Sequence, residues 1–197
     1  MRRRLGVPGE AALIGRGVSH CATCDGGFFR GQTVVVVGGG DSALDEALVL
    51  AGVVGRVVLV HRGDAFDATQ GQADAIAATP NVEVRFGSVV DAVEGDGAVL
   101  TGVVVRDLRS GNAETIPAAG LFVYVGLSPE TGWLEGVAAL DAEGRVVVDT
   151  HLAASVPGLF AAGDVRSGTR AMLDEAVEDG VRAARSALAY LAGGATQ

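Results

Sequence analysis

The stretch TVVVVGGGDSALDEALVLAG, residues 33–52, decides the fold of this 197-residue chain. Its first five residues, Thr33–Val37, form a continuous β-branched run, which is typical of a parallel strand buried on both faces. Three glycines follow, and residues 41–52 then have the apolar spacing of a helix that ends at glycine. A second apolar run, Arg56–Val60, comes next. This order of elements predicts an α/β protein with a buried parallel sheet.

The glycine turn has the spacing of a dinucleotide-binding turn, Gly38-x-Gly40-x-x-Ala43. The first glycine permits a tight turn, the second lets the backbone approach a pyrophosphate, and the small third residue lets helix and strand pack closely. The amides at the start of the helix then face the anion. We therefore predict a Rossmann-like dinucleotide-binding domain. The alternative is a glycine-rich turn in an α/β core that binds nothing.

The rest of the chain predicts short strands and two further helices. The run over 89–94 and the run over 102–108 alternate like antiparallel strands. A short helix is expected near Cys21. The other strands are expected over 81–86, 114–116, 121–125, 146–148 and 159–162, and the helices near 70–79 and over 171–191.

Composition and charge bear on the partners of the protein. A formal net charge of −9 argues against nucleic acid or an anionic membrane as the main partner. No apolar run reaches transmembrane length, and the basic start MRRR lacks the apolar region of a signal peptide. We therefore expect a cytoplasmic protein that binds neither nucleic acid nor membranes.

Both cysteines, Cys21 and Cys24, fall in one CxxC motif, and Asp25 follows directly. Such a pair can cycle between dithiol and disulfide, and the adjacent carboxylate could carry a proton if burial raised its pKa. A structural zinc site needs four ligands, and the chain adds only three histidines, so no metal is expected. A thioredoxin-like active site is a further alternative, but the glycine turn directly downstream argues against it.

Three segments resemble one family. GRGVSHCATCDGGFFRGQTVVVVGGGDSALDEAL, residues 15–48, resembles the pyridine-nucleotide domain of bacterial-type, low-molecular-weight thioredoxin reductases. VGLSP at 125–129 and GLFAAGDV at 158–165 resemble segments of the same family. The resemblance extends from about Leu5 to Leu191. It implies a route of electrons from NADPH to FAD, then to the cysteine pair, and finally to the disulfide of a thioredoxin-like protein.

The resemblance also implies site residues. Cys24 would face the flavin, Cys21 would attack the partner's disulfide, and Asp25 would be the acid or base. The nicotinamide dinucleotide would be bound by Gly38, Gly40, Asp41, Ser42, Ala43, His61 and Arg62. The FAD would be bound by Gly126, Gly163, Asp164, Arg170 and Ala171.

By this resemblance, residues 1–14 are a linker arm and residues 15–121 an NAD(P)-binding domain that carries the CxxC motif. Residues 122–197 are the C-terminal part of a FAD-binding domain. The sequence contains no second glycine turn, GxGxxG, of the kind that holds FAD in the family. We therefore expect an incomplete FAD site in this chain.

Two signatures depart from the family pattern. The family's HRRxxFRA reads HRGDAFDA over residues 61–68, so that Gly63 and Asp67 replace two arginines. Each lost charge-assisted contact weakens binding of a 2′-phosphate by about 1.5–3 kcal/mol, which leaves both NADPH and NADH open. The family's Arg-Gln pair near the flavin reads Arg170-Ala171.

The leading hypothesis is a flavoprotein oxidoreductase of the thioredoxin-disulfide reductase type, acting as a homodimer. One alternative is a non-catalytic nucleotide-binding fragment of such a reductase, which the missing second glycine turn favours. Another is a flavin-dependent dithiol oxidase with weakened NADPH use, which Gly63 and Asp67 favour and the intact turn from Gly38 to Ala43 opposes.

Overall fold

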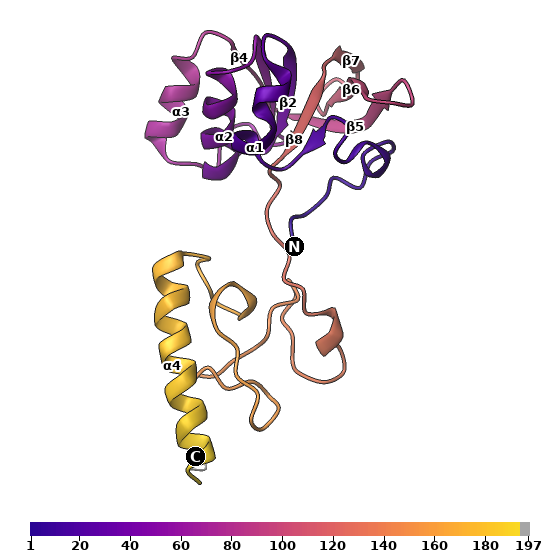
Figure 1. Cartoon of the computed structure of the whole chain (residues 1–197). Coiled ribbons are helices and arrows are strands. Elements are labelled where there is room, and N and C mark those ends of the chain that lie inside the picture. Colours follow the sequence, from indigo (N-terminus) through magenta and orange to yellow (C-terminus); the bar gives the residue numbers. More distant parts are fainter. Residues whose placement is uncertain (194–197) are drawn as a thin grey trace. The chain divides into compact units, whose positions relative to one another are not determined.

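The computed structural model describes residues 1–193 and contains two compact units (Figure 1). The N-terminal unit comprises Arg2–Gly126, and the C-terminal unit comprises Met1 and the chain from Leu127 onward. The last four residues of the predicted region 122–197 lie outside the described residues.

A five-stranded parallel sheet forms the centre of the N-terminal unit, which confirms the predicted α/β class. The continuous run in β2 is buried because both faces of this sheet are covered. The two-residue edge strand β1 was not predicted. In spatial order the strands are β1 (Val18–Ser19), β8 (Gly120–Val123), β2 (Thr33–Val37), β3 (Arg56–Val60) and β4 (Val82–Arg85).

Helices cover one face of this sheet and a second sheet covers the other (Figure 1). Val34 and Val36 of β2 pack with the helices, whereas Val35 and Val37 pack with the second sheet. The unit is thus built in three layers, and alternate residues of each central strand serve different cores. The helices are α1 (Ala22–Asp25), α2 (Asp41–Ala51) and α3 (Gln70–Ala77); the antiparallel strands are β5 (Ser88–Gly95), β6 (Leu100–Asp107) and β7 (Ala113–Pro117).

The C-terminal unit consists of loops and short 3₁₀ turns around one long helix, α4 (Leu173–Leu191). Its small core includes Leu134, Val146 and Ala161. The strands predicted over 146–148 and 159–162 are wrong, because these segments form only isolated bridges. The predicted helix over 171–191 begins two residues late, since Ala171 has a left-handed backbone with φ of 55°.

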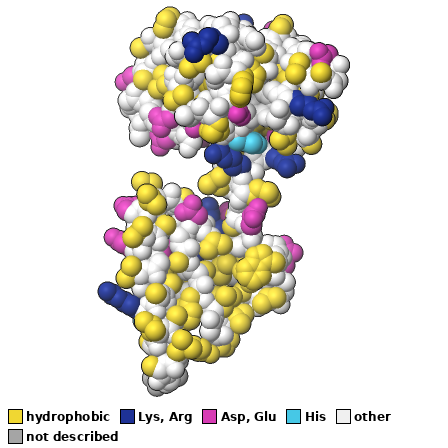
Figure 2. All heavy atoms as spheres, in the orientation of Figure 1, with side chains coloured by type: hydrophobic (Ala, Val, Ile, Leu, Met, Phe, Trp, Pro, Cys, Tyr) yellow, Lys and Arg dark blue, Asp and Glu magenta, His cyan; other side chains and the backbone are white. Residues whose placement is uncertain are grey.

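Apolar side chains are exposed on the C-terminal unit, as Figure 2 shows. On α4 they recur along one stripe that includes Leu173, Val177 and Leu188, and Trp133 is exposed in the loops. Across residues 1–193, no helix combines the length and apolar character needed to cross a membrane.

Candidate functional site

Cys21 and Cys24 form a disulfide at the start of α1, with their Cα atoms 5.3 Å apart. Cys21 follows β1 directly, has an extended backbone and caps the helix: its Sγ accepts a hydrogen bond of 3.2 Å from the Cys24 amide. Cys24 is exposed and Cys21 is half-buried. A CxxC disulfide at a solvent-facing helix start is open to exchange with an external thiol or disulfide.

The Asp25 carboxylate is fixed by Ser19, a residue that the sequence interpretation did not select. The Ser19 hydroxyl donates to Asp25 Oδ2 at 2.5 Å and accepts from the Cys21 amide at 3.1 Å. One hydroxyl therefore links the carboxylate to the backbone of the first cysteine. Asp25 is half-buried, and its backbone amide donates to the Cys21 carbonyl at 3.1 Å.

The first amide of α1, that of Ala22, has two acceptors from distant parts of the chain. It lies 3.0 Å from Glu46 Oε2 and 3.0 Å from the Tyr124 hydroxyl oxygen. Burial, and then the charge of Glu46, raise the pKa of Tyr124 well above its ordinary value, so its hydroxyl stays protonated and also bonds the Glu46 carboxylate. Because Glu46 belongs to α2, the helix of the glycine turn holds the helix of the disulfide.

The glycine turn lies at the carboxyl end of β2, the edge where ligands bind in open α/β sheets. Gly38 has φ of 150°, and a Cβ there would lie 2.5 Å from the Tyr124 carbonyl oxygen and 2.6 Å from Ala43 Cβ. Ala43 and Leu44 amides both donate to the Gly40 carbonyl, which closes the first turn of α2. The predicted set from Gly38 to Ala43 is therefore one local structure.

Asp41 and Ser42 are exposed at the start of α2. Their amides occupy helix positions that have no carbonyl partner within the helix. The Asp41 carboxylate is turned toward the segment after β3, where its Oδ1 accepts from the Thr69 amide at 2.8 Å.

The two residues predicted at the tip of β3 have different environments. His61 is buried, and its ring lies against Gly39 so closely that a Cβ on Gly39 would be 2.7 Å from His61 Cγ. The ring also borders Phe66 and Phe86, with centroid distances of 6.0 and 6.3 Å. Arg62 is exposed. His61 therefore packs under the turn, and Arg62 lies at the surface of the tip.

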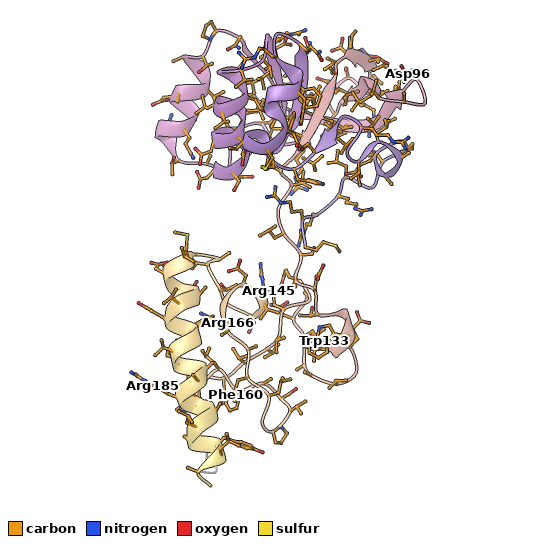
Figure 3. The ribbon with its side chains drawn as sticks, viewed as in Figure 1. Asp96, Trp133, Arg145, Phe160, Arg166 and Arg185 are labelled. Atoms are coloured by element: carbon orange, nitrogen blue, oxygen red, sulfur yellow. A yellow bond between two sulfur atoms is a disulfide. The ribbon has the colours of Figure 1, made fainter. Side chains whose placement is uncertain are left out.

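Gly163 and Asp164 form a 3₁₀ turn that is attached to α4 through Asp179. Asp179 is 1% exposed; its Oδ2 accepts from the Gly163 amide at 3.1 Å, and its carboxylate pairs with Arg166, which lies beside α4 (Figure 3). The Arg166 guanidinium holds the pKa of Asp179 below its ordinary value. The Asp164 side chain is exposed.

Asp164 and Ala171 meet at a cavity of about 190 Å³ in the C-terminal unit, which Pro129, Arg145 and Val165 also line. Arg170 is exposed, and its amide donates to Glu175 Oε2 at 2.7 Å, which lowers the pKa of Glu175. Two of the residues predicted for FAD, Asp164 and Ala171, therefore share one hollow.

The remaining residue predicted for FAD, Gly126, belongs to the N-terminal unit. It has φ of 95° and accepts the Arg3 amide at 3.0 Å.

Several contacts of the site were not found from the sequence. The signals existed only in part: Glu46 lies one turn into the predicted helix, and Ser19 precedes the CxxC motif by two residues. Their partners lie far along the chain, as in the 102-residue separation between Ala22 and Tyr124, and no local pattern reports such a contact.

The comparisons with known proteins agree with this geometry. The chain is 40% identical over 189 residues to the thioredoxin reductase of Treponema pallidum, and this match covers 96% of the chain and 61% of the relative. It is also 40% identical to one of the proteins of the alkyl hydroperoxide reductase of Pseudomonas aeruginosa, with 96% of the chain and 36% of that relative covered. The chain thus spans about three fifths or less of the length of these curated relatives.

Among solved structures, the thioredoxin reductase of Lactococcus lactis in its FR conformation matches with a TM-score of 0.92 and 35% identity. That match covers 98% of this chain and 64% of the other, so the resemblance to thioredoxin reductases read from the sequence is confirmed. The family model described as pyridine nucleotide-disulphide oxidoreductase matches residues 1–187. The chain therefore belongs to the pyridine nucleotide-disulphide oxidoreductase family.

Proposed function

We propose that this chain carries the nucleotide and dithiol half-reactions of a thioredoxin-disulfide reductase. Electrons pass from NADH or NADPH through FAD to Cys21 and Cys24, and from there to the disulfide of a thioredoxin-like protein. The observation that carries the proposal is the disulfide at the start of α1, held through Glu46 by the helix that the glycine turn opens.

The turn fits a dinucleotide pyrophosphate. The backbone of Gly38 and Gly39 packs too closely for a side chain, whereas a Cβ at Gly40 would meet only the Asp67 carbonyl oxygen, at 3.8 Å. Space for an anion therefore lies over Gly40, next to the amides of Asp41 and Ser42. These groups would bind the pyrophosphate and orient the dinucleotide along the edge of the sheet.

The C-terminal unit fits part of a FAD. Gly163 adopts φ of 72° in the turn, and Asp164 and Ala171 line the neighbouring cavity. We infer that these residues contact the flavin nucleotide and that the site in this chain is incomplete. When bound, FAD supplies hydride acceptance from the nicotinamide and passage of the electron pair to a disulfide.

The exchange step belongs to the chain's own sulfurs. In the reduced pair, the Cys21 thiolate attacks one sulfur of the partner's disulfide, which forms a mixed disulfide and releases a partner thiolate. The Cys24 thiolate then attacks the Cys21 sulfur, restores the disulfide seen here and releases the second partner sulfur. Two electrons and two protons reach the partner, and Asp25, oriented by Ser19, carries a proton between the sulfurs and solvent.

Assembly and location are further parts of the proposal. The exposed apolar residues Leu173, Val177 and Leu188 support association of the C-terminal unit, and we propose a homodimer. Light scattering at several protein concentrations tests it. A cytoplasmic location and the absence of nucleic-acid binding stay predictions from the sequence.

The test begins with the chain purified in excess FAD, freed of unbound cofactor and examined for flavin absorbance. Oxidised thioredoxin is then offered together with NADH or NADPH, and loss of the nicotinamide absorbance is followed. We expect turnover that Cys21→Ser abolishes while bound flavin is unchanged. Absence of flavin would limit the chain to nucleotide binding, and turnover that survives Cys21→Ser would refute the proposed role of the pair.

A further inference from the structure

The segment after β3 is fixed against the glycine turn by its backbone. The Asp67 amide donates to the Gly39 carbonyl at 2.8 Å, and Asp67 pairs with Gly40 in an isolated parallel bridge. Two residues later, the Thr69 amide donates to Asp41 Oδ1 at 2.8 Å. Asp67 is therefore held beside the turn that would bind the pyrophosphate, with its side chain exposed.

The charges at this edge nearly cancel. Asp64 forms an ion pair of 2.5 Å with Arg109, which arrives from the turn between β6 and β7. Within residues 1–193, Asp67 has no cationic partner and Arg62 has no anionic one. One arginine and one fixed carboxylate are thus left to meet the ribose of a bound dinucleotide.

Gly63 adds no charge and is closely packed. A Cβ there would lie 2.7 Å from His61 Nε2 and 3.3 Å from the Ala65 carbonyl oxygen. The buried His61 ring occupies the space that a larger side chain at this position would need.

A carboxylate at this place distinguishes the two nicotinamide dinucleotides. It accepts hydrogen bonds from the ribose hydroxyls of NAD, whereas it repels the 2′-phosphate of NADP. We propose that this chain prefers NAD(H) to NADP(H) and that Asp67 is the residue that sets the preference. The inference rests on the proposed function, because it concerns the nucleotide site assigned there.

The experiment measures binding and needs no bound flavin. Isothermal titration calorimetry of the full chain with NAD⁺ and with NADP⁺ gives the ratio of the two dissociation constants. We expect NAD⁺ to bind at least about tenfold more tightly, since one repulsive contact replaces one charge-assisted contact. Asp67→Arg should reverse the ratio, and Asp67→Asn should narrow it several-fold.

A matched control is Asp74→Arg, which makes the same charge change at an exposed position on α3. It should leave the ratio within about twofold of the wild type, because exposed charges beyond the site are screened by salt. An equal shift in this variant would assign the preference to overall charge and overturn the role of Asp67.

Two further outcomes are distinct from each other. Equal or tighter binding of NADP⁺ by the wild-type chain would overturn the inference and leave the proposed reductase function standing. Binding of neither dinucleotide would remove the nucleotide site, and with it both the proposed function and this inference. Asp67→Asn keeps the test decisive if Asp67→Arg fails to fold.

Discussion

Replacing Gly39 with alanine should destabilise the N-terminal unit through one contact. The added methyl would lie 2.7 Å from His61 Cγ and nearer still to two other ring atoms, whereas nonbonded carbon atoms normally stay about 3.5–4.0 Å apart. The ring cannot retreat easily, because His61 is buried and borders Phe66 and Phe86. Overpacking of this kind costs about 1–3 kcal/mol of unfolding free energy.

Gly40→Ala is the matched control for this prediction. A Cβ at Gly40 meets only the Asp67 carbonyl oxygen at 3.8 Å, and its backbone, with φ of −90°, suits alanine. We expect unchanged or slightly higher stability, because alanine lowers the entropy of the unfolded chain. Binding of NAD⁺ should nevertheless weaken, since the methyl occupies the side from which a pyrophosphate approaches. The two adjacent glycines should thus separate stability from binding.

The assay is urea unfolding with pulsed hydrogen exchange, read on peptides from β2 and β3 so that only the N-terminal unit is reported. A loss of about 2 kcal/mol lowers the urea midpoint by about 1 M for a urea m-value near 2 kcal/mol/M. A double variant with His61→Ala should recover part of the loss as a favourable coupling energy. Equal stability of Gly39→Ala and Gly40→Ala would refute the steric argument.

Three other predictions concern contacts outside the turn. Asp179→Asn should lower the stability of the C-terminal unit by about 2–4 kcal/mol, measured by calorimetry, because it leaves the nearly buried Arg166 without its counter-charge. Since the folded pKa of Asp179 is lowered, its contribution is present above the unfolded pKa of about 3.9 and is lost as pH falls through the folded value; an Asp179→Asn variant should show a flatter acid limb. Ser19→Ala should slow exchange of the disulfide with dithiothreitol about three- to tenfold and alter its pH profile by freeing Asp25, whereas Ser19→Thr should restore both. Tyr124→Phe should cost about 1 kcal/mol and remove a tyrosine that stays protonated during alkaline titration; normal titration of that tyrosine in the wild type would contradict its burial.

The central sheet could be predicted because its signals are local. The runs in β2 and β3 are apolar at every position, which only a strand covered on both faces tolerates. Val146 and Leu159 misled the same reasoning: they are apolar because they pack in a small core, and their neighbours form single bridges instead of a ladder. Apolar runs therefore report burial, and a strand also needs a partner of matching length.

The candidate site was predictable in its chemistry and not in its supports. CxxC and the glycine turn are short motifs whose function depends on backbone geometry, so sequence alone indicates them. Arg109 meets Asp64 only because a hairpin 45 residues away folds back to the tip of β3. Asp179 meets Arg166 because α4 returns to the 163–165 turn. These pairings depend on tertiary structure, which spacing along the chain does not encode.

Helix α2 sets a fixed length between two chemical centres of the N-terminal unit. Asp41 stands at the nucleotide turn, and Glu46 holds the helix of the disulfide. Five residues of α-helix measure about 7.5 Å along the axis and turn through about one and a half revolutions. The helix thus works as a ruler with one end on the electron donor and a mark for the electron acceptor. The loops around it can drift in sequence without changing that spacing, whereas one inserted residue between the two marks would swing Glu46 away from α1.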